Sequence, residues 1–388
     1  MSEENKTETA EKKTLKHEKK EREPFIRMIR RPQIPMWKAW AIRLGAILIS
    51  LVFCALVTVL VTGENPFSLY AAMWRGAFGK DYIWSTMQNV AILLCISLAV
   101  TPAFKMHFWN TGAEGQTLIA ALATAMCMFF LGDVLPTWLL FVVMIAASIL
   151  AGILWAVIPA VFKAQWNTNE TLFTLMMNYV AIQLVEVFLK IADKSGSNTV
   201  GPSLLTKGWL PVIGGQKYLL NILIVAVVTV LVYIYLKYSK HGYEISVVGE
   251  SEKTARYIGI NVKKVIIRTM ILSGAICGLT GLLLVAGTSH SIDSNLVDGR
   301  GFTAIMVSWL AKFDPFTMIL TTLLLVFLAR GADEVTSKFG LNSDFSEILT
   351  GIILFFIIGC EFFINYQVHF NHHKKEKTAS AAVSGEGN

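Results

Sequence analysis

Charged residues are scarce in this chain. Asp, Glu, Lys and Arg together make up 16% of its 388 residues, whereas hydrophobic residues make up 54%. A soluble domain of this length needs a far more polar surface, so the composition excludes one. Several uncharged runs are long enough to cross a bilayer core of roughly 30 Å as helices. The sequence therefore predicts an all-α polytopic membrane protein.

Motifs for nucleotide binding and for catalysis are also missing. The sequence contains no G-x-x-x-x-G-K-[ST] loop, so the chain cannot by itself cradle the phosphates of ATP. It contains no H-E-x-x-H, no G-x-S-x-G and no dense cluster of Asp, Glu and His inside the apolar runs. We therefore expect a non-enzymatic chain without a cofactor of its own, in which any use of ATP and Mg²⁺ belongs to a partner subunit.

Cysteine is sparse, and its positions indicate no special chemistry. The cysteines lie within or beside apolar runs, without metal-ligand spacing, at Cys54, Cys95, Cys127, Cys277 and Cys360. Such residues behave as small hydrophobic side chains. We expect neither a disulfide nor a zinc site.

The basic charge is concentrated in two stretches. Residues 1–43 hold twelve Lys and Arg, and residues 237–268 hold seven more, within a formal net charge of +7. Such blocks mark cytoplasmic segments of membrane proteins and need no nucleic-acid partner. We expect a disordered basic tail over residues 1–38, a lipid-embedded domain over 39–368 and a second tail over 369–388, with both termini in the cytoplasm.

The apolar runs predict about ten transmembrane segments. They cover residues 39–62, 83–104, 116–131, 138–162, 171–189, 219–236, 269–292, 301–311, 315–329 and 348–360. The eighth and ninth have only 11 and 15 uncharged residues, so they are expected to be half-helices or a re-entrant pair, as short segments are tolerated when they are buried in protein. Either ten crossings or eight crossings and a re-entrant hairpin leave the two termini on one side.

Two of the predicted spans carry small residues at helical spacing. The fourth span contains Ser148 and Gly152, and the seventh contains Gly274, Gly278 and Gly281. Small residues four apart let neighbouring helix backbones approach closely, although glycine is also common in any transmembrane helix. These positions are candidates for helix packing.

A polar stretch at 243–264 separates the sixth and seventh spans. Ser251 can cap a short helix there, and Gly259 can end it, because glycine most easily adopts the left-handed conformation that closes a helix. A short helix in a basic membrane loop indicates a docking surface. The alternative is a solvated connector with some helical propensity.

Polar side chains occur where the second span passes into the third and where the fifth begins. They are Asn110, Glu114, Gln116, Asn169, Glu170 and Asn178. An ionised carboxylate in the middle of a bilayer costs about 2.5–3.5 kcal/mol on insertion scales, so Glu114 needs a wet cavity, a helix amino terminus or a partner. One interpretation is a solute pathway lined by neutral hydrogen-bonding groups; the other is that these groups cap helices or lock them together.

Two short segments echo one another. Glu114-Gly-Gln-Thr-Leu-Ile opens the third span, and Arg300-Gly-Phe-Thr-Ala-Ile opens the eighth, at matching places in two halves that would enter from opposite sides. Inverted repeats with interrupted helices place binding sites at their interface in many transporters. The echo indicates such a repeat, unless the identities are due to chance.

Several motifs together resemble a known family. Asn110-Thr-Gly-Ala-Glu-Gly-Gln116 is similar to the N-x-G-A-E-G-Q signature of permease subunits from bacterial ABC importers of nucleosides and simple sugars, the branched-chain-amino-acid/ribose-type permeases. Further resemblances to the same family occur at 169–181, 249–261, 272–281 and, more loosely, 299–305. The matches are in order across about residues 85–330. Thr111, Ser251-Glu252 and Ile258 depart from the family pattern, so the coupling helix is expected to start differently.

The resemblance implies a transmembrane subunit of an ATP-driven importer of the bacterial plasma membrane, with nucleosides as its expected solute. Its implied partners are a cytoplasmic ABC ATPase, a second permease subunit, related or identical, and an extracellular substrate-binding lipoprotein. The implied ATPase-coupling residues are Gly249, Glu250, Ala255, Arg256, Tyr257, Gly259 and Ile260. A permease for a simple sugar and a secondary transporter or channel without an ATPase remain alternatives.

Overall fold

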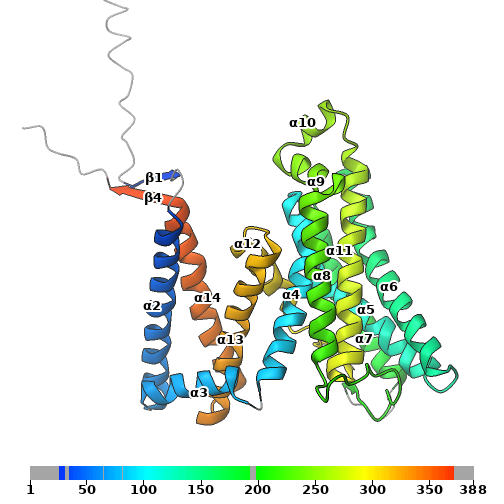
Figure 1. Ribbon diagram of the computed structural model, residues 1–388, viewed down its shortest axis with the longest axis horizontal. Helices are drawn as coiled ribbons and strands as arrows, with labels where there is room; N and C mark the ends of the chain where they lie inside the picture. Colours follow the sequence, from blue (N-terminus) through cyan, green and yellow to red (C-terminus); the bar gives the residue numbers. More distant parts are fainter. Residues whose placement is uncertain (1–25, 31–34, 64, 81, 193–197, 371–388) are drawn as a thin grey trace, which may run out of the picture. The chain divides into compact units, whose positions relative to one another are not determined.

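The computed structural model describes residues 26–30, 35–63, 65–80, 82–192 and 198–370, and most of this part of the chain is helical (Figure 1). The helices are α2 (Met36–Thr62), α3 (Pro66–Phe78), α4 (Ile83–Lys105), α5 (Ala113–Leu131), α6 (Thr137–Trp166), α7 (Glu170–Ala192), α8 (Leu219–Tyr238), α9 (Lys240–Glu250), α10 (Glu252–Tyr257), α11 (Val262–Leu284), the π-helical turn η2 (Val285–Ser289), α12 (Arg300–Leu310), α13 (Pro315–Phe339) and α14 (Ser343–Asn365). Two small antiparallel sheets pair β1 (Ile26–Arg30) with β4 (Tyr366–Phe370) and β2 (Thr199–Val200) with β3 (Ile292–Asp293).

Nine of the described helices are long and apolar enough to cross a membrane. They are α2, α4, α5, α6, α7, α8, α11 together with η2, α13 and α14. The prediction of an all-α polytopic membrane protein is therefore confirmed.

The chain divides into two compact units, of which residues 53–352 form the larger. Within this unit α4 and α11 are central, because 89% and 78% of the residues in their most apolar windows are buried, against 22% in α6 and 28% in α8. In this unit α4 packs on both α8 and α11, and α11 also packs on α5 and α6 (Figure 1). The outer helices are apolar on nearly all sides, as expected where they face lipid.

Small residues let α6 and α11 approach at backbone distance. A Cβ added to Gly152 would lie 2.9 Å from the Cα of Gly278, and one added to Gly278 would lie 2.8 Å from the carbonyl oxygen of Ser148. A Cβ on Gly274 would lie 2.7 Å from the Cβ of Ala156. Gly281 lies against α5 in the same way. Real Cβ atoms do not tolerate such distances, so larger residues at these positions would push the helices apart.

The eighth and ninth predicted segments differ from one another. α12 has 11 residues, about 16 Å at 1.5 Å per residue, and is a half-helix as the sequence predicted. α13 has 25 residues, about 37 Å, so the expectation that 315–329 is a half-helix is wrong. The helix continues beyond Ala329 because Arg330 donates a hydrogen bond to Ser85 of α4 and Gly331 packs against Met73 of α3.

The prediction of a disordered tail over residues 1–38 is also corrected where the structure describes it. β1 pairs with β4, with Arg27 opposite His369, and α2 already begins at Met36. The partner strand lies at the other end of the chain, which no local pattern reveals. The expected boundary between 368 and 369 likewise falls inside β4. Residues 1–25 and 371–388 of the two predicted tails lie outside the described residues.

Candidate functional site

A buried polar cluster surrounds the turn between α4 and α5. The Asn110 side chain, which is fully buried, donates to Ser273 Oγ of α11 at 3.2 Å and accepts from the backbone N–H of Gly112 at 3.1 Å. The side-chain amide of Gln116 donates to Asn110 Oδ1 at 3.1 Å. Asn110 and Gln116, two of the predicted pathway residues, therefore form hydrogen bonds with one another and with neighbouring elements. Such bonds hold α4, α5 and α11 together.

The start of α7 holds the start of α5. Asn178 is 4% exposed; its Oδ1 accepts from the N–H of Gly115 at 2.9 Å, and its Nδ2 donates to the carbonyl oxygen of Thr111 at 2.9 Å. Thr111 also donates to the carbonyl oxygen of Thr171 at 3.0 Å, and its hydroxyl lies 3.0 Å from that of Thr174. The threonine that departs from the family pattern thus adds a polar link between the α4–α5 turn and α7.

Glu114 joins the starts of two helices. Its Oε1 accepts from the N–H of Gly299 at 2.8 Å, and its Oε2 accepts from the N–H of Gly301 at 2.6 Å. The carboxylate therefore caps α12, where the free N–H groups and the helix dipole favour negative charge. The two echoing segments meet at this point. Arg300, next to Gly301, donates to Asn89 of α4 at 3.3 Å, and Asn89 was not singled out from the sequence.

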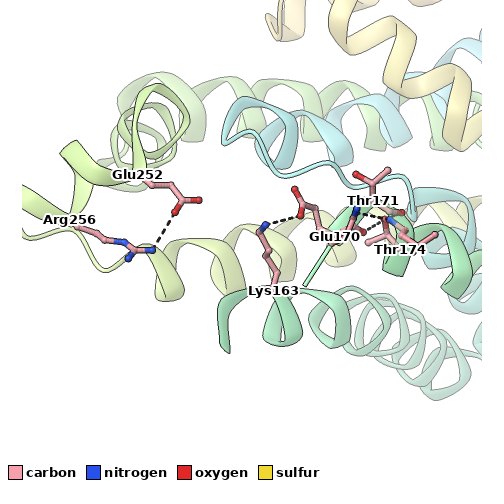
Figure 2. Close-up of polar contacts among 8 residues, drawn as sticks. Lys163, Glu170, Thr171, Thr174, Glu252 and Arg256 are labelled. Atoms are coloured by element: carbon pink, nitrogen blue, oxygen red, sulfur yellow. Dashed lines mark hydrogen bonds and ion pairs between the residues drawn. The ribbon is translucent and has the colours of Figure 1, made fainter. Parts of the chain in front are cut away.

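The other two predicted pathway residues, Asn169 and Glu170, lie where α6 passes into α7. Figure 2 shows Glu170 there, beside Lys163. Asn169 Oδ1 accepts from the N–H of Leu172 at 3.1 Å and so caps α7. Glu170 pairs with Lys163 of α6 at 2.8 Å, and both side chains are largely enclosed. Solute contact by any of the six predicted pathway residues stays a prediction.

The short helix predicted within the polar stretch at 243–264 is present as α10, whereas residues 243–250 belong to α9 and residues 262–264 already belong to α11, which the sequence did not predict. Ser251 Oγ accepts from the N–H of Thr254 and caps α10, and Gly259 follows the helix with a φ of +86°. The N–H of Ile260 donates to the carbonyl oxygen of Ala255 at 2.9 Å, which closes the turn. Ser251, one of the departures from the family pattern, therefore supplies the cap.

α10 presents nearly all of its surface outward. Ala255 is its one buried residue, whereas Tyr257 is 92% exposed and Ile258, just after the helix, is 52% exposed. Glu250 and Arg256 are exposed too. Large, fully exposed aromatic side chains are typical of contact surfaces rather than of connectors.

α9 fixes α10 to the helix bundle. Gly249 is buried, and a Cβ there would overlap the carbonyl oxygen of Lys105 at the end of α4. Glu244 of α9 accepts a hydrogen bond from Arg268 of α11 at 2.6 Å, and this hydrogen bond holds the pKa of the Glu244 carboxyl below its usual range. Displacement of α10 would therefore act on α4 and α11, the two central helices.

A small cleft of about 20 Å³ lies between α10 and the bundle. It is lined by Met106, His107, Phe108, Lys163, Val248, Glu252 and Ile266. The sequence reading did not identify this cleft, because its residues come from five separate segments. Among the described residues no group of three or more His, Cys, Asp or Glu side chains is placed to hold a metal ion.

The chain is similar over most of its length to known permeases. The guanosine ABC transporter permease protein NupP of Bacillus subtilis is 28% identical over 86% of this chain and 95% of its own length. The glucose ABC transporter permease protein TsgB13 of Haloferax volcanii is 27% identical over 92% of this chain and 96% of its own length. The nucleoside ABC transporter permease protein NupB of Lactococcus lactis is 24% identical over 80% of this chain and 89% of its own length. Residues 82–358 match the family described as branched-chain amino acid transport system / permease component. The chain is therefore a multi-pass membrane protein that belongs to this permease family.

Proposed function

We propose that this chain is a transmembrane subunit of an ATP-driven importer in a bacterial plasma membrane. The observation that carries the proposal is α10, a short capped helix whose Tyr257 is 92% exposed. A chain without a phosphate-binding loop needs a partner to use ATP, and α10 is the surface best suited to receive one. The similarity to three ABC transporter permeases supports this interpretation.

The α10 end of the bundle would then face the cytoplasm. Residues 237–268, which include α10, hold seven Lys and Arg, as expected for a cytoplasmic segment. The basic start of the chain favours a cytoplasmic amino terminus. Because β1 pairs with β4, residues 366–370 near the carboxyl terminus would lie on the same side as residues 26–30. A cytoplasmic ABC ATPase binds α10 in this arrangement, and an extracellular lipoprotein delivers solute at the other end.

Transport would proceed by alternating access without covalent chemistry in this chain. Closure of the ATPase dimer displaces α10, and α9 passes the displacement to α4 and α11 through Gly249 and Glu244. A second permease subunit, identical or related, completes the pathway, whose two gates open in turn. ATP and Mg²⁺ stay on the partner.

Nucleosides are the solute that we propose first. NupP is named for guanosine and NupB for nucleosides, and both align with most of this chain. The neutral amide and hydroxyl groups of Asn110, Gln116 and Asn178 suit an uncharged solute, whether they line the pathway or hold its walls in place.

Co-purification and uptake test the proposal. The chain, purified from its native membrane by mild detergent extraction, should bring down a nucleotide-binding subunit. Proteoliposomes that contain this complex should accumulate a nucleoside only with ATP. Uptake that persists without ATP, with no ATPase bound, would identify a secondary transporter or channel and refute the proposal.

Import of a simple sugar is the second candidate, because TsgB13 is named for glucose and covers 92% of this chain. Isothermal titration of the cognate lipoprotein separates the two solutes. Binding of nucleosides supports the first candidate, and binding of sugars alone supports the second.

A further inference from the structure

Lys163 lies where three parts of the larger unit meet. It belongs to the last turn of α6, its ammonium group pairs with Glu170 at the start of α7 at 2.8 Å, and it lines the same cleft as Glu252 of α10. Figure 2 shows Lys163 between the two carboxylates. One ammonium group therefore pairs with the carboxylate that opens α7 and shares a cleft with a carboxylate of α10.

The carboxylates of Glu170 and Glu252 differ in exposure and in the strength of their ion pairs. The Glu170 side chain is 13% exposed, and its pair with Lys163 is largely shielded from solvent. Glu252 is 53% exposed and pairs at 3.3 Å with Arg256, which is 67% exposed. Exposed pairs within one helix contribute little to stability, so Glu252 can leave Arg256 at small cost. The cleft between Glu252 and Lys163 holds about one water molecule, so a modest movement of α10 would close it.

The start of α7, which Glu170 opens, leads to the junction of α5 and α12. The carbonyl oxygen of Glu170 accepts from Thr174 at 2.8 Å, and the hydroxyl of Thr174 lies against Thr111. One turn further, Asn178 holds the N–H of Gly115, next to the Glu114 that caps α12. Packed side chains with hydrogen bonds can carry a displacement between two sites when one member has two discrete positions.

We propose that Lys163 is a positioning residue for transport, which passes displacements of α10 to the start of α7 by exchanging Glu170 for Glu252. In the present structure its ammonium group rests on Glu170. Movement of α10 toward the bundle brings Glu252 onto Lys163, loosens Glu170 and frees the start of α7 to shift against α5. The inference rests on the proposed function, because it needs a partner that moves α10.

A purely local role makes different predictions. Lys163 lies near the carboxyl end of α6 and Glu170 opens α7, so each charge also favours its own helix terminus. A staple of that kind would hold the α6–α7 turn together, and it would not depend on Glu252 at all.

The test compares Lys163→Met, Glu252→Gln and the double variant in the full complex, reconstituted in proteoliposomes. The readout is the number of nucleoside molecules taken up per ATP hydrolysed. We expect each single variant to lower this ratio by about tenfold, a typical allosteric coupling, and the double variant to be no worse than either. Lys163→Arg should restore most of the ratio. Lys207→Met is the control. It also removes an ammonium group from an ion pair, but the partner, Asp133, is 86% exposed and does not belong to α10, so the ratio should stay unchanged.

The outcomes separate the two roles and the proposed function. An unchanged ratio in Glu252→Gln, or losses that multiply in the double variant, would overturn the exchange. If Lys163→Met fails to assemble, Glu252→Gln and Lys163→Arg still decide the question, because Glu252 is exposed and its change leaves the fold intact. Absence of ATP-dependent uptake in the unaltered complex would overturn the proposed function itself, and the inference with it.

Discussion

Glu114 Oε2 lies 2.6 Å from the backbone nitrogen of Gly301, so the carboxylate at the start of α5 caps the start of α12. A Cβ on Gly301 would lie 2.5 Å from the backbone nitrogen of Glu114, so the two helix starts are also in backbone contact. The starts of α5 and α12 thus form one structural unit, in which neither can move far without the other.

Replacing Glu114 with Gln should destabilise this unit. The amide keeps one acceptor but turns an N–H group toward the N–H of Gly299 or Gly301, and an unpaired donor costs about 1–3 kcal/mol. Thermal unfolding in detergent should show a lower midpoint. Glu347→Gln, at an exposed position of α14, is the matched control and should leave the midpoint unchanged. An equal shift in both variants would contradict the cap.

Replacing Gly152 with Leu should disrupt the contact of α6 with α11. The new side chain would overlap the backbone of Gly274 and Gly278, and overpacking of this kind costs about 3 kcal/mol. Size-exclusion chromatography should show a smaller monodisperse fraction. Gly351→Leu tests the same change where a Cβ would meet nothing within 4 Å, and it should behave as the unaltered protein. A normal profile for Gly152→Leu would refute the close packing.

Replacing Tyr257 with Ala should weaken binding of the ATPase without affecting the fold. The side chain is 92% exposed, so its removal costs no packing in this chain, whereas a central aromatic contact in an interface contributes about 2 kcal/mol, or about 30-fold in affinity. Binding of the purified nucleotide-binding subunit measures the effect. Tyr179→Ala, 64% exposed on α7, is the control. Equal affinity in both variants would exclude Tyr257 from the interface.

The pair of Glu244 and Arg268 should make stability depend on pH. Arg268 lowers the pKa of Glu244 from its ordinary value of 4.5. The stabilisation is present above that value and is lost as the pH falls through the lower pKa of the folded state. The Arg268→Gln variant should have a lower midpoint of thermal unfolding at pH 7 than the unaltered protein. Its midpoint should also fall less than that of the unaltered protein when the pH is lowered below 5. An identical fall in both proteins would show that the pair does not contribute.

Local features of the site were predictable from the sequence, and contacts between distant segments were not. Ser251 and Gly259 act within one turn of α10, so their residue types sufficed to place the cap and the end of the helix. Asn110 and Gln116 were recognised as polar groups at depth. That they hydrogen-bond one another depends on how α4, α5 and α11 pack.

The end of α13 was predicted wrongly for a similar reason, because it also depends on a contact between distant segments. Arg330 looks like the end of a span in an apolar profile, but its guanidinium donates a hydrogen bond to Ser85 of α4 and the helix continues. The cleft at Lys163 could not be predicted from the sequence for the same reason, because its lining comes from α6, α10 and the α4–α5 turn, among other segments. A hydropathy profile describes each segment in isolation, whereas the end of α13 and the cleft at Lys163 depend on contacts with other segments.

Photo-crosslinking from α10 tests the central claim most directly. A photoreactive phenylalanine derivative at position 257 in the full complex should form an adduct with the nucleotide-binding subunit, and the yield should change between the nucleotide-free and the ATP-bound complex. The same group at position 179 should not reach that subunit. No adduct from position 257 in any nucleotide state would contradict the claim that α10 receives the force that drives transport.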